Sequence, residues 1–329
     1  MKLELFTAVT MAASAGASLS DSSPESIKMM WDAYKNDHGR RYATEGEEMV
    51  RYDNFKNSLK AIDQRNEAER VAGGSAVHGI TQFSDMSQEE FERLLNYEPE
   101  ATFMRGSANE VEVPPYDGAL SAVDWTGKYT TPVKDQGYCG SCWAFAATEQ
   151  IESDAMRTLG KSYVLSPQQM VSCDQKDGGC QGGRQESAYD YIKSAGGQET
   201  ESAYPYSSYS GKSNGQCKAD SSKFVMGVKG YSTVRGESSM ASYVKSTGPL
   251  SIGVDASDWN SYTGGIKASC GTRVNHAVQA VGVDTGSGGY WKIRNSWSKS
   301  FGEAGYIRLA YGKNTCGLAS QGSTYVSVK

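Results

Sequence analysis

The sequence contains few histidines and no long apolar run. Only His38, His78 and His276 occur among its 329 residues, so any chemistry that needs imidazole must use one of these three. No stretch of 18 apolar residues exists, and no transmembrane helix is expected. The net charge of -5 excludes the strongly basic surface that is typical of nucleic-acid-binding proteins. Asn-x-Ser/Thr sites are also absent, which gives no support to sorting through an N-linked glycan.

The composition is otherwise that of a folded protein with room for two domains. Charged residues make up 22% of the chain and hydrophobic residues 38%, with 20 Tyr and 6 Trp. These values exclude a disordered chain and permit a sizeable core. The 7 cysteines are an odd number. In a secreted protein, this number indicates three disulfides and one free, reactive thiol.

The N-terminus has the pattern of a secretory signal. Lys2 provides a positive start, residues 5–13 form a short apolar stretch, and the small residues 15–17 resemble a cleavage site. We therefore assign residues 1–17 to a signal peptide, with a frayed N-terminus as the alternative. Passage through the secretory pathway would favour disulfide formation.

Charge and composition divide the rest of the chain near residue 118. Residues 21–117 contain 20 acidic and 11 basic side chains, a net charge of -9, whereas residues 118–329 contain 17 and 21, a net +4. The first part has helical periodicity and ends in a proline-containing segment, 97–118, that is typical of a linker. The opposite charges favour an acidic pro-segment, 18–117, that lies on a basic domain. Two ordinary domains of unequal charge would give the same numbers.

Capping residues predict three helices in the acidic part. The Ser-Pro pair at 23–24 starts a helix that ends before Gly39. A capping box at Thr44 starts a longer helix that runs to about Val71, and Ser87 starts a short third helix. Apolar residues recur at helical spacing, so this part of the chain is expected to form a helical unit.

The strongest local pattern surrounds Cys142. A glycine-rich turn that begins at Gln136 delivers this cysteine to the start of a helix, which is expected to stop at Gly160. The positive helix end and its free N–H groups stabilise a thiolate, and cysteine pKa values at such sites fall to roughly 3.5–7.5. The position therefore predicts a nucleophile with a lowered pKa.

His276 is the only histidine after residue 118, and Asn295 follows it by 19 positions (295 minus 276). A cysteine, a distant histidine and an asparagine in this order are the signature of a papain-like protease. The spacing of Cys139 and Cys142 leaves two alternatives, a redox pair or half of a zinc site. His276 could also be a packed core residue.

These residues resemble the papain family of cysteine proteases, most closely its cathepsin L-like branch, in the form of a prepro-enzyme. The resemblance starts near residue 24 and includes residues 290–297 (YWKIRNSW) and 302–306 (GEAGY). The acidic segment follows the spacing of the family's inhibitory helix and second pro-motif at Glu47, Arg51, Phe55, Ile62, Asn66, Gly79, Phe83 and Asp85. Four positions depart from the family pattern, Ser58, Thr81, Ser298 and Phe301. The last two stand beside Asn295, so we expect an altered preference on the leaving-group side rather than inactivity.

The resemblance implies an α+β fold of two lobes, with a helical left lobe, a β-barrel-like right lobe and an active-site cleft between them. A helical inhibitory propeptide, 18–117, would precede the papain-like peptidase domain, 118–329, and block its cleft. The implied disulfides are Cys139–Cys180, Cys173–Cys217 and Cys270–Cys316, which leave Cys142 free. Neither a metal nor a cofactor is expected.

The resemblance also implies a role for each catalytic residue. The Cys142 thiolate attacks the peptide carbonyl, and the His276 imidazolium protonates the departing amine. Asn295 would orient His276, and Trp297 would shield the bond between them from water. The side chain of Gln136 and the backbone N–H of Cys142 would form the oxyanion hole.

A set of substrate-binding residues follows in the same way: Gly182, Gly183, Arg184, Gln185, Gly253, Val274, Asn275, Trp297 and Gln321. The two adjacent glycines would let the substrate backbone approach closely. Arg184 at the rim and Gln321 at the floor of the S2 pocket predict a reduced preference for bulky hydrophobic P2 residues, with polar or acidic ones tolerated. The alternative is that Arg184 points into solvent.

The expected function is that of a secreted or lysosome-like cysteine endopeptidase, made as a zymogen and activated when acid triggers removal of the pro-segment near residues 115–118. Expected partners are protein and peptide substrates, the protein's own propeptide and cystatin-type inhibitors. We expect a monomer in the secretory pathway, resident in a lysosome, another acidic vesicle or the extracellular space. The alternatives are an inactive peptide-binding homologue and a Cys-His acyl transferase.

Overall fold

The computed structural model describes residues 18–98 and 110–329. The predicted signal peptide, 1–17, lies outside the described residues, as does the middle of the predicted linker. No helix within the described ranges is both long and apolar enough to cross a bilayer.

The pro-segment contains the three helices that the capping residues predict. Helix α1 spans Pro24–Asp37, α2 spans Glu45–Ala72 and α3 spans Gln88–Glu92. The side chains of Ser23, Thr44 and Ser87 accept hydrogen bonds from the first turns of these helices, and Ser87 forms a full capping box with Glu90. Helices α1 and α2 pack through a small core of their own, formed by Trp31, Tyr34, Phe55, Leu59 and Ile62.

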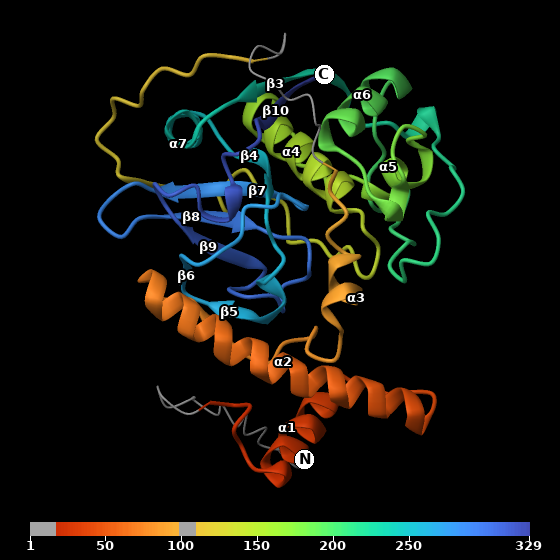
Figure 1. The fold of residues 1–329 in the computed structure, drawn as a ribbon. Helices are drawn as coiled ribbons and strands as arrows, with labels where there is room; N and C mark the ends of the chain where they lie inside the picture. Colours follow the sequence, from red (N-terminus) through yellow and green to blue (C-terminus); the bar gives the residue numbers. More distant parts are fainter. Residues whose placement is uncertain (1–17, 99–109) are drawn as a thin grey trace, which may run out of the picture.

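One lobe of the part of the chain that carries the predicted catalytic residues, 118–329, which is called the catalytic domain below, is helical. Helix α4, Cys142–Leu159, contacts α5 (Pro167–Cys173) and α6 (Gln185–Ala195) on one side and strands of the sheet on the other (Figure 1). Every residue of α4 from Cys142 to Ala155 is buried, the charged Glu149, Glu152 and Asp154 included, so the helix is covered on all sides and forms the centre of the domain. Its N-terminal residue, Cys142, is fixed in position by this burial.

The other lobe is built on a sheet of eight strands. The path of paired strands runs β3-β10-β4-β7-β8-β9-β6, and β2 pairs with β7. The strands are β2 (Ala122–Asp124), β3 (Val228–Val234), β4 (Leu250–Val254), β6 (Ile266–Lys267), β7 (His276–Asp284), β8 (Tyr290–Arg294), β9 (Tyr306–Ala310) and β10 (Ser323–Val328), with α7 (Glu237–Ser246) between β3 and β4. Within the described residues the path of paired strands does not close into a ring, so the lobe that the resemblance implies to be β-barrel-like is not a complete barrel.

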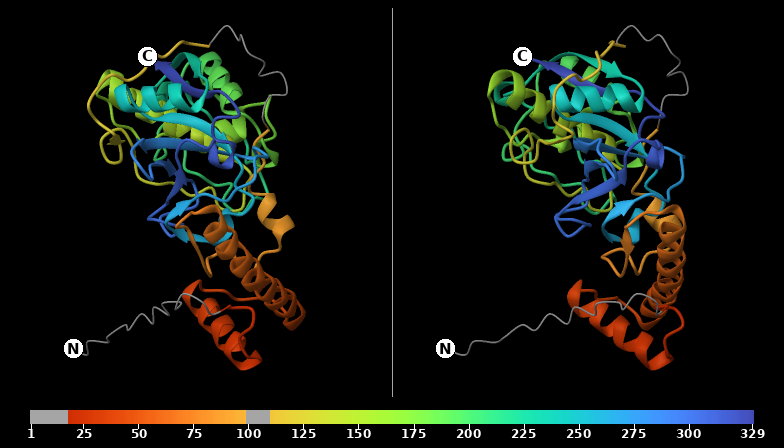
Figure 2. Two further views of the ribbon diagram at one scale, coloured as in Figure 1. Left: turned by 60° about the vertical axis from the view of Figure 1, so that its left-hand side comes forward. Right: turned by 90° about the vertical axis from the view of Figure 1, so that its left-hand side faces the viewer.

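The pro-segment lies on one side of the catalytic domain, with α2 next to the sheet lobe and α1 on the outside (Figure 2). Its short strand β1 (Val77–His78) pairs in antiparallel fashion with β5 (Tyr262–Gly264) of the catalytic domain. Two unpaired backbone edges thereby satisfy each other. The chain then passes through α3 toward the junction of the two lobes (Figure 1).

Three disulfides brace the catalytic domain. They join Cys139 to Cys180, Cys173 to Cys217 and Cys270 to Cys316, the same pairs that the family resemblance implies. Cys142 is the one free cysteine of the described chain, and it is buried. Because Cys139 is bonded to Cys180, the Cys139-x-x-Cys142 spacing forms neither a redox pair nor half of a zinc site.

Candidate active site

Three elements bring the predicted catalytic residues together at the junction of the lobes. Cys142 is the first residue of α4, His276 is the first residue of β7, and Asn295 directly follows β8, the strand that pairs with β7. Antiparallel pairing of these two strands places Asn295 beside His276, and the Nε2 atom of His276 lies 2.8 Å from the Oδ1 atom of Asn295. The His276, Asn295 and Cys142 side chains are all fully buried.

Aromatic side chains cover the bond between His276 and Asn295. The ring of Trp297 stacks on the imidazole with 4.8 Å between ring centroids, and Trp259 meets it edge-on at 6.2 Å. Phe301 packs against both indoles and is itself buried. The ring of Phe301 therefore fills space behind Trp297.

The side chain of Gln136 is held with its amide N–H groups directed at two carbonyls. Its Nε2 atom donates to the carbonyl oxygens of Leu94 and Cys139, each at 2.9 Å. Its Oε1 atom accepts from the hydroxyl of Ser296 at 2.7 Å. Leu94 belongs to the pro-segment, so a foreign backbone carbonyl already occupies the donor that was predicted for the oxyanion hole.

The thiol of Cys142 also contacts the pro-segment, because it donates to the carbonyl oxygen of Leu95 at 3.4 Å. Burial raises the pKa of the Cys142 thiol to about 12, and the neighbouring backbone N–H groups offset only part of this rise. Burial likewise lowers the pKa of His276 to about 4, although the bond to Asn295 opposes the change. The predicted low-pKa thiolate is therefore wrong for this form of the protein. The pro-segment excludes the water that both charged forms require, and the pair is neutral.

The pro-segment crosses the site by backbone hydrogen bonds. The Tyr97 amide donates to the Asn275 carbonyl at 3.0 Å, and the Glu98 amide donates to the Gly183 carbonyl at 3.2 Å. The Gly183 amide in turn donates to the Asn96 carbonyl at 3.3 Å. Gly183 and Asn275, both predicted to bind substrate, are thus the residues that hold the pro-segment.

Two glycines make this close approach possible. A Cβ atom on Gly182 would lie 2.5 Å from the Asn96 carbonyl oxygen, and one on Gly183 would lie 2.7 Å from the indole of Trp143. Gly182 also has a backbone φ of 121°, which residues other than glycine rarely adopt. Glycine is therefore required at Gly182 because the pro-segment backbone lies against it, and at Gly183 because the indole of Trp143 leaves no room for a side chain.

The side chain of Tyr97 fills the pocket predicted to be S2. Its ring packs in one buried cluster with Val274, and a Cβ atom on Gly253 would lie 2.9 Å from its Cε1 atom. Burial and the charge of Glu186 raise the pKa of the Tyr97 phenol, so its hydroxyl stays neutral. The start of the predicted linker at residue 97 is thus wrong, because Tyr97 is an ordered part of the contact with the catalytic domain.

The comparisons with known proteins agree with this geometry. The sequence profile described as papain family cysteine protease matches residues 120–326. The chain belongs to the papain family of cysteine proteases. A second profile, the cathepsin propeptide inhibitor domain (I29), matches residues 31–91. This papain-family chain is therefore a cysteine endopeptidase that carries its own inhibitory propeptide.

Similar proteins of the papain family include two curated relatives. A probable cysteine protease of Arabidopsis thaliana, RD19D, is 38% identical over 314 residues, covering 87% of this chain and 83% of the relative. Digestive cysteine proteinase 3 of Homarus americanus is 35% identical over 319 residues, covering 94% and 96%. Among solved structures, digestive procathepsin L 3 from the larval midgut of Tenebrio molitor has a TM-score of 0.80 at 30% identity, covering 93% of this chain and 100% of that one.

The remaining predicted S2 residues of this protease lie in three different settings. Arg184 caps the start of α6 and is half-buried, and its charge acts on the phenol of Tyr97. Gln185 is fully buried and accepts from the Ser251 hydroxyl at 3.1 Å, so it faces the core. Gln321 lies half-buried just before β10, and no hydrogen bond within the described residues joins it to Tyr97.

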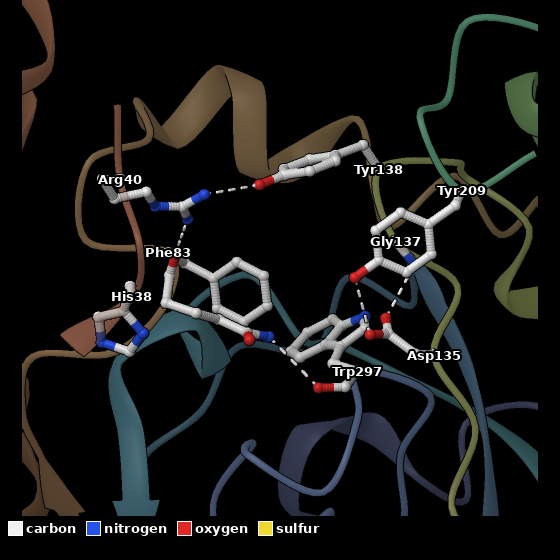
Figure 3. Close-up of a pocket in the computed structure, with 9 residues that line it drawn as sticks. His38, Arg40, Phe83, Asp135, Gly137, Tyr138, Tyr209 and Trp297 are labelled. Atoms are coloured by element: carbon white, nitrogen blue, oxygen red, sulfur yellow. Dashed lines mark hydrogen bonds between the residues drawn. The ribbon is translucent and has the colours of Figure 1, made fainter. Parts of the chain in front are cut away.

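A second pocket of the protease is lined in part by Trp297 (Figure 3). Arg40 and Gln82 of the pro-segment cover it: Arg40 donates to the Tyr138 hydroxyl at 3.0 Å, and Gln82 donates to the Trp297 carbonyl at 3.3 Å. The pocket is lined by His38, Arg40, Gln82, Phe83, Asp135, Gly137, Tyr138, Tyr209 and Trp297. The propeptide thus covers both flanks of the catalytic pair. Across the described ranges, no group of three or more metal-ligating side chains gathers in this protease.

Sequence reasoning missed the propeptide residues that occupy the site, Leu94, Leu95 and Tyr97. Their contribution comes largely from backbone carbonyls and amides, which carry no residue-specific signal. The one usable signal was Tyr97, an aromatic residue close to α3, but the loss of helical periodicity after it favoured a linker.

Proposed function

We propose that the mature enzyme hydrolyses peptide bonds through an acyl-enzyme on Cys142. The thiolate attacks the carbonyl carbon, while the Gln136 side chain and the Cys142 amide stabilise the oxyanion. The imidazolium of His276, oriented by Asn295, then gives its proton to the leaving amine, and water releases the acid product in the second half of the reaction. The observation that carries this proposal is the pair of neighbouring propeptide carbonyls at the site, that of Leu94 bound to Gln136 and that of Leu95 bound to the thiol of Cys142.

Removal of the propeptide would convert the neutral pair into the reactive one. The thiol regains water, which lowers its pKa from about 12, and the N-terminus of α4 favours the thiolate in the same direction. His276 regains water as well, which raises its pKa from about 4. The proton that the thiol loses on release is balanced by the proton that His276 gains, so this pair alone gives release no net dependence on pH. We therefore assign the proposed acid activation to other titratable groups of the interface.

The proposed processing has two cuts, after residue 17 and in the segment 115–118, which yields a mature domain 118–329. The second segment is accessible, because Asp117 and Gly118 are exposed. We further propose passage through the secretory pathway, in keeping with three disulfides, to an acidic vesicle such as a lysosome or to the cell exterior. A monomer that is open to cystatin-type inhibitors remains part of the proposal.

The reduced preference for bulky hydrophobic P2 residues stays a prediction, and the contact with Tyr97 bears on it in two ways. The pocket over Gly253 accommodates an aromatic ring, whereas the charged neighbours Arg184 and Glu186 favour a polar end to that ring. A peptide library randomised at P2 distinguishes the two tendencies. A plain preference for Leu would contradict a polar contribution from these residues.

One experiment tests the proposed function against its alternatives. The acid-processed chain is titrated with a thiol-directed epoxide and then assayed for peptide hydrolysis, with Cys142→Ala as the control. Hydrolysis that disappears in proportion to the label supports the proposal. A chain that binds peptide without turnover would be an inactive homologue, and transfer of the acyl group to an added amine at the expense of hydrolysis would indicate an acyl transferase.

A further inference from the structure

A buried polar cluster joins the propeptide to the catalytic domain next to β6. The Glu69 carboxylate, on α2, accepts from the ammonium of Lys267 at 3.0 Å and from the backbone amides of Ala268 and Ser269 at 2.8 and 3.2 Å. Lys267 also pairs with Asp258 at 2.7 Å. The Glu69 and Lys267 side chains are only 2% and 1% exposed. The stability of an ion pair this deeply buried depends on both charged groups, since the loss of one leaves a buried charge with less compensation.

His78 of strand β1 completes this cluster and is 3% exposed. Its Nδ1 atom lies 2.8 Å from the Ser261 hydroxyl, and its Nε2 atom lies 3.5 Å from the ammonium of Lys267. An ammonium can only donate, so Nε2 acts as the acceptor and the proton is assigned to Nδ1 from these partners. The ring is therefore neutral while the propeptide is bound.

The charges around His78 already balance without it. Lys267 on β6 and Arg65 on α2 are cations, whereas Glu69 on α2 and Asp258 beside Lys267 are carboxylates. A proton on Nε2 would set an N–H group against the ammonium of Lys267 and leave an excess positive charge at a buried position. Burial, followed by the charges of Lys267 and Arg65, accordingly lowers the pKa of His78 to about 2.

We propose that His78, Lys267 and Glu69 form an acid-sensitive latch, in which proton uptake by His78 favours release of the propeptide from β5 and β6. The proposal rests on the acid activation proposed above and names the group that senses the acid. After release, His78 is in water and takes up a proton at the ordinary value of about 6.5. The bound state therefore holds fewer protons than the released state, and binding is strongest above that pH.

The size of the pH effect on propeptide binding follows from the difference between the pKa of His78 in the bound state and its pKa after release. Between about pH 6.5 and pH 2, each unit of acidification weakens the bound state about tenfold through this one group. At pH 4.5 the equilibrium constant for closing the latch is about 100-fold lower than at neutral pH. His38 and His276 also have lowered pKa values as a result of burial, so the contribution of His78 must be measured as a difference.

Backbone amides at the same interface report whether the latch is closed. The amides of Ser75 and Ala76 donate to the Ile266 carbonyl, and the Gly79 amide donates to the Ser261 carbonyl. All three bonds cross from the propeptide to the catalytic domain. Hydrogen–deuterium exchange of a peptide that covers residues 75–79 therefore measures opening at the latch itself.

The test compares variants in the full-length chain that also carries Cys142→Ala, which prevents self-processing. Protection of residues 75–79, corrected for intrinsic exchange, is measured from pH 7.5 to pH 4.5. We expect His78→Gln to match its parent at pH 7.5, because Gln can donate to Ser261 and accept from Lys267, and to retain about 100-fold more protection at pH 4.5. Equal loss of protection in the two proteins would overturn the proposal.

A second variant separates sensing from binding. Glu69→Gln removes one of the two carboxylates that pair with Lys267, and the one on the propeptide, without changing shape, so protection should fall at every pH while its dependence on pH stays that of the parent chain. A parent-like level of protection in Glu69→Gln would contradict the latch. Exchange is read without catalysis, so a mature domain that fails to hydrolyse peptides would refute the proposed function and leave the latch result standing.

Discussion

Phe91 offers a direct measure of how tightly the propeptide closes the site. Its ring, on α3, is fully buried and lies 5.3 Å from Trp297 and 5.4 Å from Phe83, measured between centroids. Trp297 belongs to the catalytic domain, so truncation to alanine removes apolar burial and an aromatic pair from the interface. Burial of a phenylalanine contributes about 1.5–3 kcal/mol and an aromatic pair about 0.5–1.5 kcal/mol. We therefore expect Phe91→Ala to weaken closure by about 3 kcal/mol, or about 10²-fold.

The rate at which the free thiol of Cys142 is alkylated measures this closure. In the intact zymogen at pH 7.5, alkylation of Cys142 requires opening, so its rate should rise about 10²-fold in Phe91→Ala. Val71→Ala is the matched control, because Val71 is 73% exposed on α2 and contributes little to the interface. If Phe91→Ala is alkylated within threefold of the wild-type rate while both variants melt like the wild type, the ring contacts do not hold the site closed.

Three further predictions concern the catalytic domain. Asn295→Ala removes the acceptor of His276 and should lower kcat of the mature enzyme about 10–100-fold with little change in KM, measured with a fluorogenic peptide; an unchanged kcat would contradict the orienting role. In the Cys142→Ala zymogen, NMR titration should find His276 neutral down to about pH 4, and a midpoint near 6.5 would show that water reaches the ring. Replacing Cys270 and Cys316 by Ala opens a loop with a sequence separation of 46 residues and should lower the free energy of unfolding by about 4 kcal/mol, read from denaturant curves.

Features that depend on nearby residues were predictable from the sequence. The starts of α1, α2 and α3 follow from side chains that cap the next turn, so a few adjacent residues determine them. The end of α4 at Gly160, with a φ of 65°, is equally local. The family resemblance supplied what local patterns could not, namely the disulfide pairs and the roles of His276 and Asn295.

Features that depend on distant segments were not predictable. The protonation of Cys142 is determined by burial under residues 94–97, and the carbonyl of Leu95, 47 positions away, accepts a hydrogen bond from its thiol. The inward direction of Gln185 depends on Ser251, on a strand from the other lobe. Net charge was also a coarse guide, because two ion pairs in the described residues, Glu69–Lys267 and Glu110–Arg235, join the oppositely charged parts. Apolar rings and backbone bonds provide much of the remaining contact.

The two carbonyls at the catalytic site have a consequence for timing. Gln136 binds the oxygen of Leu94, whereas the sulfur of Cys142 meets the oxygen of Leu95, so no single peptide bond is both polarised and attacked. The segment that we propose is cut, 115–118, lies elsewhere, with the Tyr116 amide bound to the Ser242 hydroxyl on α7. A closed molecule is thus unable to process itself, and the first cuts must come from a neighbour that has already opened. Conversion should begin with a lag that shortens as protein concentration rises or when a trace of mature enzyme is added.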